Sequence, residues 1–430
     1  QMVGTQWEIL AARLGEEKVH TLSMSAGNDL FPDVKADGKG RVWVAWQNFE
    51  GGFSDIYTAF YQPDSRTWSR PLQVTTHHAG DWEPRLTFGR EDEALIVFDT
   101  YRDGDYDVWL ARVSPKGAVE KMPVTTGPRY EARAEAAVAA DGRSVWVAYE
   151  SAPTRWGKDL GSEWRSRGGG LHYDRHLYLA HVDLASGKVE TIANVTGLIP
   201  NIIPKPGSVG TSAIDVPELV VDGKGNPWLF FRYSFVTGRS NWRGAVAKYD
   251  VAAKQWSEAR SLGHSAYCLD RRTSAVLDKN GSIVAVWPSD LRQGKQQGDA
   301  GIYLTRIDPA ESVPMVETLK DVLADRTEPD PPPFNRTPER DRDDHHAWSF
   351  TGQEYTLYWG DFHRHTDFSN CRTTDDGCIT EHYRYAYDAG GLDYLGTSDH
   401  TDAGKTYHPY EWWQTQKYAD MFTNPGFFLG

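Results

Sequence analysis

Short runs of alternating apolar and polar residues dominate the chain up to about residue 320. One unit starts with residues 32–36, turns at Asp37-Gly38 and continues with the apolar run 41–46. Two further runs, at 55–61 and 71–75, complete a set of four. Short runs rich in β-branched and aromatic residues, bounded by turn residues, predict β-strands. We therefore expect each unit to form a four-stranded antiparallel sheet.

The four-strand unit recurs, with a turn at a matching place in each copy. The turns at Asp37, Gly89 and Asp141 lie 52 residues apart each time (89 − 37 and 141 − 89). Later turns, at Asp222-Gly223 and Asn280-Gly281, follow at longer intervals, which indicate loop insertions. Each Asp-Gly or Asn-Gly pair is predicted to supply the positive φ of a two-residue hairpin. Four strands in about 50 residues are typical of a β-propeller blade, and unrelated stacked β-sandwiches would not keep this register.

The N-terminal segment matches only half of a unit. Residues 7–14 resemble a third strand and residues 19–23 a fourth, while residues 316–319 are predicted to be the fourth strand of the fifth full unit. A half-blade with exposed strand edges is a liability. We therefore expect a mostly β chain with about six four-stranded blades, the first incomplete. Its inner strands are expected upstream of Gln1 or in another segment, and we favour a truncated N-terminus.

The predicted loops differ in length between the two ends of the propeller. The long loops, between second and third strands and between blades, share one end. We predict that this end is a binding or docking surface, with capping of the blade junctions as the alternative. Its loops carry Trp82-Glu83, residues 103–107, Arg129-Tyr130-Glu131, residues 155–175, Asn241-Trp242-Arg243 and Asp270-Arg271-Arg272. The acidic residues at 103–107 are interpreted as turn residues, because Val108 and Ser114 replace the glycine and bidentate acid of a calcium loop.

Composition narrows the classes of partner. The 430 residues include 46 basic and 60 acidic side chains, so the formal net charge is −14. Such a balance argues against a nucleic-acid backbone or an anionic membrane surface as the main partner. No apolar run approaches the ~20 residues that span a bilayer. We expect a small-molecule or glycan-type substrate. By analogy with other aromatic-rich propellers, an extracytoplasmic location, periplasmic or secreted, is favoured.

A proline-rich and charged segment divides the chain. Residues 327–346 combine a run of prolines with alternating acids and bases, a composition that cannot build a core. We therefore predict a β-propeller over residues 1–322, a linker over 323–353 and the start of an α/β domain over 354–430.

Metal-type side chains follow two predicted strands of this last region. An apolar run at 355–359 leads to His363 and His365, which point the same way if the strand continues. A helix is predicted over 379–389, and a second strand over 392–398 ends at Asp399-His400. Parallel βα units place their functional groups at the C-terminal ends of strands. Both sets of side chains are therefore expected at one edge of a sheet.

Two motifs here resemble a known superfamily. Gly360-Asp361-Phe362-His363-Arg364-His365-Thr366 with Ser369, and then Thr397-Ser398-Asp399-His400, are similar to the first two motifs of the PHP (polymerase and histidinol phosphatase) metal-dependent phosphoesterases. With Tyr358-Trp359 before them and Tyr410-Glu411-Trp412-Trp413 after them, they resemble more closely the DUF3604 family of PHP-like proteins of undefined function.

The resemblance implies a distorted (β/α)7 barrel that binds two or three metal ions, usually zinc, manganese or iron. By position, His363, His365 and His400 match metal ligands, and Cys371 stands where the superfamily often has another. Cys371 is either a thiolate ligand or a packed cysteine. Asp361 and Asp399 are expected to orient ligands from the second shell. No catalytic residue is assigned.

The predicted barrel is incomplete in this chain. Only 77 residues (430 − 354 + 1) follow residue 353, whereas such a barrel needs about 200. We therefore expect a C-terminal truncation, and no activity from this fragment alone. The hypothesis is a metal-dependent hydrolase, most simply a phosphoesterase, whose propeller binds substrate or regulates access. The alternative is a glycan- or protein-binding propeller with a degenerate PHP-like domain. A propeller glycosidase or lyase would need paired carboxylates at a defined separation.

Overall fold

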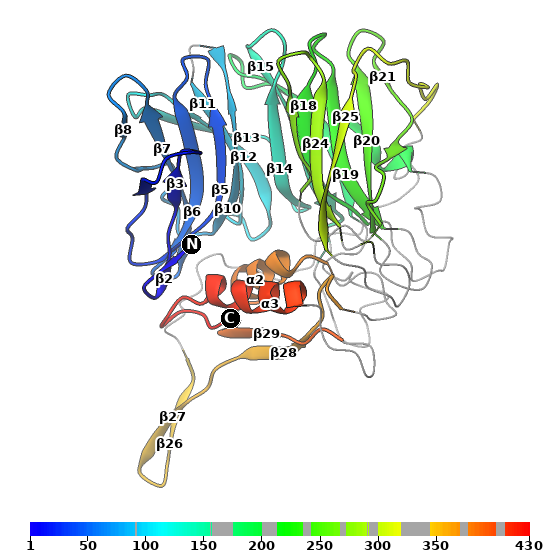
Figure 1. The fold of residues 1–430 in the computed structure, drawn as a ribbon. Coiled ribbons are helices and arrows are strands. Elements are labelled where there is room, and N and C mark those ends of the chain that lie inside the picture. The colour runs from blue at the N-terminus through cyan, green and yellow to red at the C-terminus, as the bar shows by residue number, and fades with distance from the viewer. Residues whose placement is uncertain are drawn as a thin grey trace, which may run out of the picture.

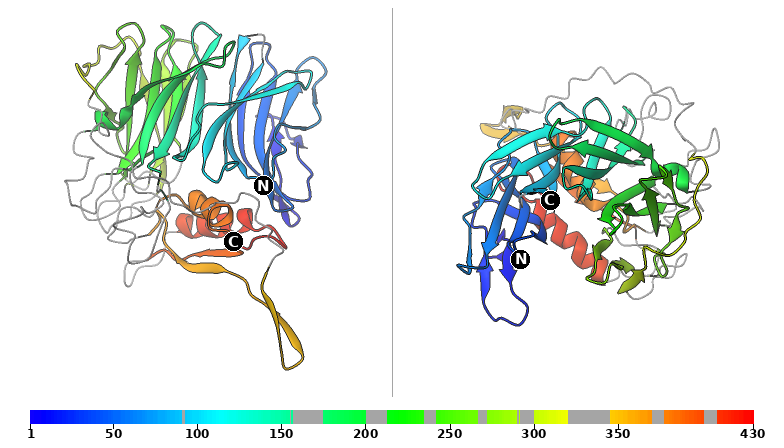
Figure 2. Two further views of the ribbon diagram at one scale, coloured as in Figure 1. Left: turned by 180° about the vertical axis from the view of Figure 1, so that it is seen from behind. Right: turned by 90° about the horizontal axis from the view of Figure 1, so that it is seen from above.

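The computed structural model describes residues 1–90, 93–154, 156, 175–199, 213–234, 242–266, 272–289, 291, 300–319, 345–369, 377–400 and 409–430. Antiparallel sheets make up most of this part of the chain and stand side by side around a central axis (Figures 1 and 2). A small α/β layer lies beneath one end of that axis (Figure 1). The predicted mostly β propeller is therefore confirmed. No helix in the described ranges is long and apolar enough to cross a membrane.

The propeller has five described blades that follow one another along the chain. Among the described residues, the first blade has five strands, the second and third have four each, the fourth has five and the last has three. The strands are β5 (Asn28–Ala36), β6 (Val42–Glu50), β7 (Phe53–Gln62), β8 (Thr67–Trp68) and β9 (Leu72–Gln73); β10 (Asp81–Phe88), β11 (Ala94–Thr100), β12 (Asp107–Val113) and β13 (Val119–Pro123); β14 (Tyr130–Val138), β15 (Ser144–Ala152), β16 (His176–Asp183) and β17 (Val189–Asn194); β18 (Ala213–Val221), β19 (Pro227–Ser234), β20 (Trp242–Asp250), β21 (Gln255–Trp256) and β22 (Arg260–Ser261); β23 (Ser274–Leu277), β24 (Ile283–Ser289) and β25 (Gly301–Ile307).

The half-unit predicted at the N-terminus is present as two short strands. β3 (Leu10–Ala12) pairs with β4 (Val19–Thr21), and a small hairpin of β1 (Met2–Val3) and β2 (Gln6–Trp7) precedes them. Seen from above, the ring of blades is open between these N-terminal strands and the last blade (Figure 2). The blade count is thus five plus a two-stranded partial blade, close to the six predicted.

The last blade differs from its prediction in one strand. Met315 forms a bridge with Ser257, and the Val316 amide donates to the Trp256 carbonyl at 2.8 Å. The segment predicted as the fourth strand of the last blade therefore joins the outer edge of the blade before it. Val316 and Leu319 pack there against the core of that preceding blade, which explains the preference.

The turns between first and second strands are longer than predicted. Gly142 and Gly281 have the predicted positive φ, at 63° and 81°. In the turns at Asp37 and Asp222 the positive φ falls instead on Gly40 and Gly225, at 76° and 86°, two residues beyond the predicted Gly38 and Gly223. The preceding aspartate closes each turn: Asp37 Oδ1 accepts the Lys39 and Arg41 amides at 2.9 and 3.0 Å. An aspartate that accepts nearby backbone N–H groups stabilises such a turn without a two-residue hairpin.

A β-bulge recurs in the innermost strand of the first four blades. Phe31, Glu83, Arg133 and Val216 all have φ between 46° and 53°, and the strand pairing shifts around each of them. Bulges re-aim side chains and are found near functional sites. The residue after the bulge reaches across the axis in this molecule: Arg85 contacts Glu135 and Glu218 of the next two blades at 2.5 and 3.1 Å.

The C-terminal region has the βαβ order that the sequence predicts. β28 (Gly360–Arg364) pairs in parallel with β29 (Tyr394–Thr397), and α2 (Ile379–Asp388) connects them, with α3 (Pro409–Phe422) following. The first strand starts later than predicted, because residues before it belong to an exposed hairpin of β26 (Ala347–Phe350) and β27 (Gln353–Thr356) that projects away from the molecule (Figure 1). A Cβ at Gly360 or Gly396 would meet the ring of Tyr394 or Phe362 from the neighbouring strand, at 2.2 and 2.6 Å, so both positions require glycine.

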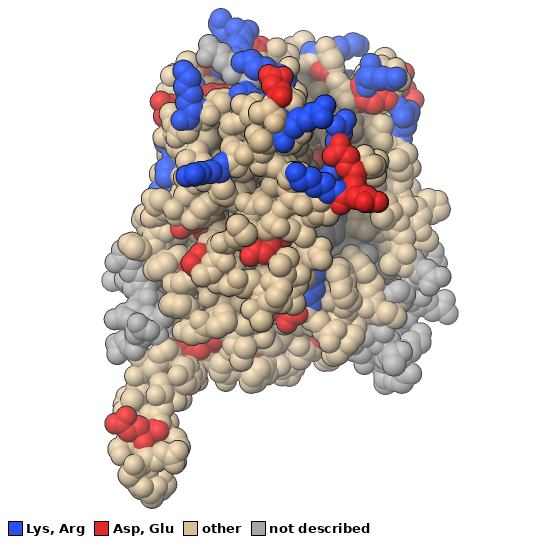
Figure 3. Space-filling model, turned by 60° about the vertical axis from the view of Figure 1, so that its left-hand side comes forward, with Lys and Arg blue, Asp and Glu red and all other residues tan. Residues whose placement is uncertain are grey.

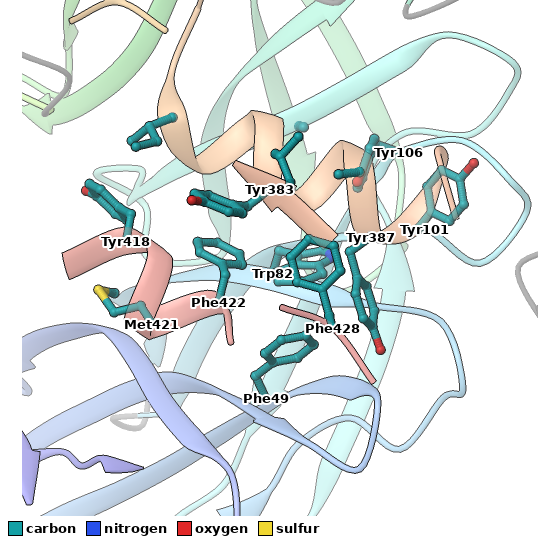
Figure 4. Close-up of a cluster of buried hydrophobic side chains, with 14 of the residues drawn as sticks. Phe49, Trp82, Tyr101, Tyr106, Tyr383, Tyr387, Tyr418, Met421, Phe422 and Phe428 are labelled. Atoms are coloured by element: carbon teal, nitrogen blue, oxygen red, sulfur yellow. The ribbon is translucent and has the colours of Figure 1, made fainter. Parts of the chain in front are cut away.

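One hydrophobic core spans the propeller and the α/β layer. Propeller aromatic residues pack against residues of α2, α3 and the C-terminal end (Figure 4). Phe422 of α3, for example, stacks on Trp82 and Tyr383 at centroid distances of 6.2 and 5.0 Å. The α/β layer is therefore packed on the propeller and not tethered beside it.

Candidate functional site

The three predicted histidine ligands lie together at one edge of the small parallel sheet. His363 is the last residue but one of β28, His365 directly follows that strand, and His400 lies three residues after the end of β29. The ring centroids of His363 and His365 are 5.3 Å apart, and those of His365 and His400 are 4.4 Å apart. Two strands that are neighbours and parallel end at the same edge, which is why residues 35 positions apart in sequence meet.

The two predicted second-shell aspartates contact backbone at this edge. Asp399 accepts the amide of Thr366 and, at 2.8 Å, its hydroxyl. Asp361 accepts the His363 amide at 2.7 Å, and the His400 amide donates to Ser369 at 2.8 Å. These bonds fix the chain around the histidines, so Asp399 and Asp361 position the backbone that carries the three imidazoles.

The surroundings of His365 favour the neutral form of its imidazole. Burial lowers the pKa of its imidazole, and the neighbouring His400, His363 and Arg364 lower it further. Neutral imidazole is the form that binds metal ions.

The fit to a metal ion is partial. Neighbouring imidazoles are a suitable donor type for zinc, manganese or iron. Within the described ranges, however, no three His, Cys, Asp or Glu side chains form a group that could hold a metal ion. Cys371 lies outside the described residues. The assignment of His363, His365, Cys371 and His400 as ligands therefore stays a prediction.

A second set of ionisable groups lies on the other side of α2, at the propeller axis. Arg384 of α2 is buried and donates to Asp99 at 2.8 Å and to Glu83 at 3.1 Å. Glu381, one turn earlier, accepts from Tyr130 and lies 3.1 Å from the Arg175 guanidinium. Arg384 and Glu381 of α2 are thus both paired with oppositely charged side chains of the propeller blades.

The start of α2 is held by two more buried arginines. The guanidinium of Arg133 contacts the Cys378 sulfur at 2.6 Å, and that of Arg232 contacts it at 3.2 Å. Arg232 also pairs with Asp215 at 2.7 Å and with Asp367 at 2.5 Å. The loop before α2 and Cys378, the N-cap residue of the helix, are therefore joined to two blades of the propeller.

The pKa values follow from this dense packing of charges. Burial opposes ionisation of Glu83, but Arg133, Arg384 and Arg272 together hold its pKa below the usual value. Burial raises the pKa of Glu150 to about 8, because the attraction of Arg133 is offset by Glu381 and Asp215. We therefore expect a network in which Glu83 is ionised and Glu150 is protonated at neutral pH.

The ion pairs of this network join α2 to the propeller, so the long-loop end serves as the docking surface for the helix. Glu83 and Tyr130 belong to the long-loop end that the sequence predicted to bind or dock, and in this structure they contact α2. The sequence patterns did not predict that Glu381, Arg384 and Cys378 contact the propeller. A detectable signal was present, since Glu381, Arg384 and Asp388 recur at helical spacing on the predicted helix.

Comparison with known proteins finds partial similarity to solved structures and no match by sequence. No family model matches the sequence, and no curated protein matches it. Three solved structures are examples of the many that are similar in part. A protein of unknown function from Dyadobacter fermentans DSM 18053 is 10% identical, over 67% of this chain and 82% of its own, with a TM-score of 0.44.

The other two solved structures are named for glycan-acting enzymes. An endo-arabinase from Bacteroides thetaiotaomicron VPI-5482 is 12% identical over 64% of this chain and 93% of its own, with a TM-score of 0.39. An α-L-arabinanase from Penicillium chrysogenum, complexed with arabinobiose, is 13% identical over 67% and 80%, with a TM-score of 0.40. Likeness at this level says nothing about the activity of this chain.

Proposed function

We propose that the α/β layer supplies the first ligands of a metal-dependent hydrolase that acts on phosphoesters. The observation that carries the proposal is the meeting of three imidazole rings, from His363, His365 and His400, at the ends of two parallel strands. The resemblance of the surrounding motifs to PHP phosphoesterases supports the reaction class. A bound divalent ion supplies an activated water and charge neutralisation at the phosphoryl oxygens.

The chain's own residues would hold and position this site. The histidines provide the donors, and Asp399 ties the loop after β28 to the end of β29. His382 of α2 lies 2.9 Å from the Arg364 guanidinium, so the helix is bonded to the strand that carries His363. Because α2 is also anchored in the propeller, the propeller sets the position of the metal-binding edge.

Metal binding by the intact chain tests the proposal. Zn²⁺ and Mn²⁺ are titrated into the wild type and a His363→Ala/His365→Ala variant, with His346→Ala, on the exposed hairpin, as a matched control. We expect the double variant alone to lose binding. Hydrolysis of p-nitrophenyl phosphate and bis-p-nitrophenyl phosphate is then measured with each metal. Equal metal affinity in all three proteins would refute the proposal.

The second candidate is a binding module whose α/β layer is catalytically inert. It is favoured by the lack of a three-donor metal group among the residues that the structure describes. A glycan-type ligand belongs to this candidate, and a cavity of about 670 Å³ beside the axis, lined in part by Trp7 and Arg272, is of suitable size. Saturable binding of arabinan or uronic-acid oligosaccharides, without metal binding, would favour it over the hydrolase.

A further inference from the structure

Three successive blade junctions, where neighbouring sheets meet, contain the same set of an acid, a hydroxyl and a second acid. The hydroxyl accepts a backbone amide, and the first acid is the residue before that amide. The second acid lies six residues after the hydroxyl (29 − 23, 81 − 75 and 131 − 125) and two residues before the bulge of the next innermost strand. In chain order the sets are Glu8, Ser23 and Asp29; Asp55, Thr75 and Asp81; and Asp107, Thr125 and Glu131.

The hydroxyl lies between the two acids of its set. It donates to the first acid at 2.7, 3.0 and 3.4 Å in the first, second and third set. The second acid lies beside the same hydroxyl, which favours its ionised form. A hydroxyl has only one proton to donate, so it cannot satisfy two carboxylates at once. One acid of each pair therefore needs a proton of its own, or else it carries an unmatched buried charge.

The second set shows this need most directly. Asp81 is fully buried, and no described residue donates a well-formed hydrogen bond to its carboxylate oxygens. Burial raises the pKa of Asp81 to about 7, and repulsion from Asp55 adds to this effect, although the Arg102 guanidinium lies 3.6 Å away. Burial also raises the pKa of Asp55, against the attraction of Lys121 and His78.

The third set holds its protons to still higher pH. Burial raises the pKa of Asp107 to about 8, and repulsion from Asp105 and Glu131 adds to this effect. Burial raises the pKa of Glu131 to about 7, against the attraction of Arg129. The other titratable groups that face this pair are Asp103 and Tyr149. Near neutral pH, both pairs therefore exchange protons with the solvent while they remain inside the fold.

The next junction shows that the acids are not needed to join two blades. Its hydroxyl, Thr196, accepts the Leu177 amide at 3.4 Å, so the backbone arrangement is repeated. The residues at the two acid positions are His176, before that amide, and Ile214, two residues before the bulge at Val216. The paired acids are thus an addition to the blade junction, confined to one side of the propeller.

That side of the propeller carries the α/β layer. An aromatic residue stands next to an acid of the second or third set in each of Trp82, Tyr106 and Tyr130. Trp82 stacks on Phe422 of α3, Tyr106 donates to Asp388 of α2 at 2.6 Å, and Tyr130 donates to Glu381 of α2. At the junction without acids, Leu177 and Ile214 belong to a separate core that contains no residue of α2 or α3.

We propose that the second and third carboxyl pairs form a proton-dependent clamp that controls how firmly the α/β layer is held on the propeller. While a pair keeps a proton, the two blades stay close and hold Trp82, Tyr106 and Tyr130 in position against α2 and α3. When both acids of a pair ionise, two like charges lie side by side in the interior, and the junction and the layer above it loosen. This inference is independent of whether the layer binds a metal ion.

The direction of the pH dependence follows from the raised pKa values. A carboxyl whose pKa is higher in the folded chain contributes stability that is complete below its ordinary pKa and is lost as pH rises through the raised value. For Asp107 this interval runs from 3.8 to about 8. The layer should therefore be held most firmly in acid and most loosely in mild alkali.

Hydrogen exchange of α2 and α3 in the intact chain at pH 6 and pH 9 tests the clamp. After correction for the intrinsic pH dependence of exchange, we expect the wild-type helices to exchange about tenfold faster at pH 9. In Asp107→Asn/Glu131→Gln, whose amide side chains cannot ionise, this increase should be about threefold smaller or less still. Glu120→Gln, at an exposed acid of β13 in the same blade, is the matched control and should behave like the wild type.

A second measurement needs no variant. The infrared carbonyl band of protonated carboxyl groups should be present in the wild type at pH 6 and decline by pH 9. Absence of that band at pH 6 would overturn the proposal, because the pairs would then be ionised in the folded chain. An equal rise of exchange in the wild type and the double variant would overturn it too, because the pH dependence would come from other groups, such as Glu150. If the double variant does not fold, the infrared band of the wild type decides.

Discussion

The two sides of helix α2 carry ionisable groups in opposite physical states. Toward the propeller, Arg384, Glu381 and their partners are buried and joined in ion pairs. Toward the sheet edge, His363 and His400 are exposed. Buried charges must be matched by partners within the protein, and then they hold two parts together. Exposed imidazoles remain available to bind a ligand. The comparison separates residues that assemble the molecule from residues that could carry its chemistry.

The distribution of charge over the surface agrees with this separation. Lys, Arg, Asp and Glu gather on the end of the propeller where the short turns lie, and much of the flank in view carries few of them (Figure 3). At the opposite, long-loop end, Glu83, Asp99, Arg133 and Arg175 contact α2 or its N-cap residue. The propeller therefore meets the α/β layer through its interior charges and its aromatic core.

The largest effect is expected when the buried side loses one partner. Arg384→Ala would leave Glu83 and Asp99 buried without this guanidinium. Removing one partner of a buried pair costs about 3–5 kcal/mol of unfolding free energy. Urea denaturation measures the loss. Arg13→Ala, at the exposed pair with Glu16, is the control and should change stability by less than about 0.5 kcal/mol. Equal effects would show that the network does not hold α2.

The pH dependence of stability is expected to come from the buried side as well. Burial raises the pKa of Glu150 from 4.5 to about 8, so in that window the unfolded chain loses a proton that the folded chain keeps. The unfolding free energy of the wild type should therefore fall as pH rises from about 4.5 to 8.

Glu150→Gln removes this contribution. Relative to the wild type, the variant should gain about 1–3 kcal/mol between pH 5 and pH 8. Thermal and urea unfolding at both pH values provide the measurement. A difference between variant and wild type that is the same at pH 5 and pH 8 would contradict the assignment.

A smaller effect on stability is expected at Asp399, which lies at the sheet edge beside the histidines. Asp399→Ala removes the bonds to the Thr366 amide and hydroxyl, at a half-buried position. A loss of about 1–2 kcal/mol is expected from hydrogen bonds to a charged group. The histidine-bearing loop should also loosen, seen as faster hydrogen exchange near Thr366. Asp399→Asn, which retains an acceptor, should recover part of the stability and part of the protection from exchange. Unchanged hydrogen exchange near Thr366 in the alanine variant would show that Asp399 does not hold this loop.

The smallest effect on stability is expected at the exposed side. His363→Ala should alter the unfolding free energy by no more than about 0.5 kcal/mol, because the side chain is exposed. Its effect should appear in Zn²⁺ affinity alone. A loss of stability comparable to that of Arg384→Ala would mean that the histidine edge is structural, and the contrast between the two sides would fail.

Sequence patterns were sufficient for features that depend on neighbouring residues. The alternation along strands, the 52-residue interval of the turns and the helix at 379–389 all rest on local periodicity, and the structure contains them. The meeting of His363, His365 and His400 was also predictable, because parallel strands end at one edge. The exact position of β28 was not, since an apolar run beside it folds into a separate hairpin.

Contacts between distant segments were beyond reach of these patterns. Arg133 and Cys378 are 245 residues apart in sequence and 2.6 Å apart in space. No local sequence pattern in either segment predicts this contact. The same holds for residues 315–316, which pair with the preceding blade, where Val316 packs against the hydrophobic core.

The order of strands, the repeat and the chemical types at the sheet edge follow from the amino-acid sequence, because hydrogen-bonding period and side-chain alternation act over a few residues. The packing of α2 on the propeller axis and the pairing of its buried charges follow from tertiary structure. They depend on which surfaces exclude water together, and that is settled when segments hundreds of residues apart come into contact.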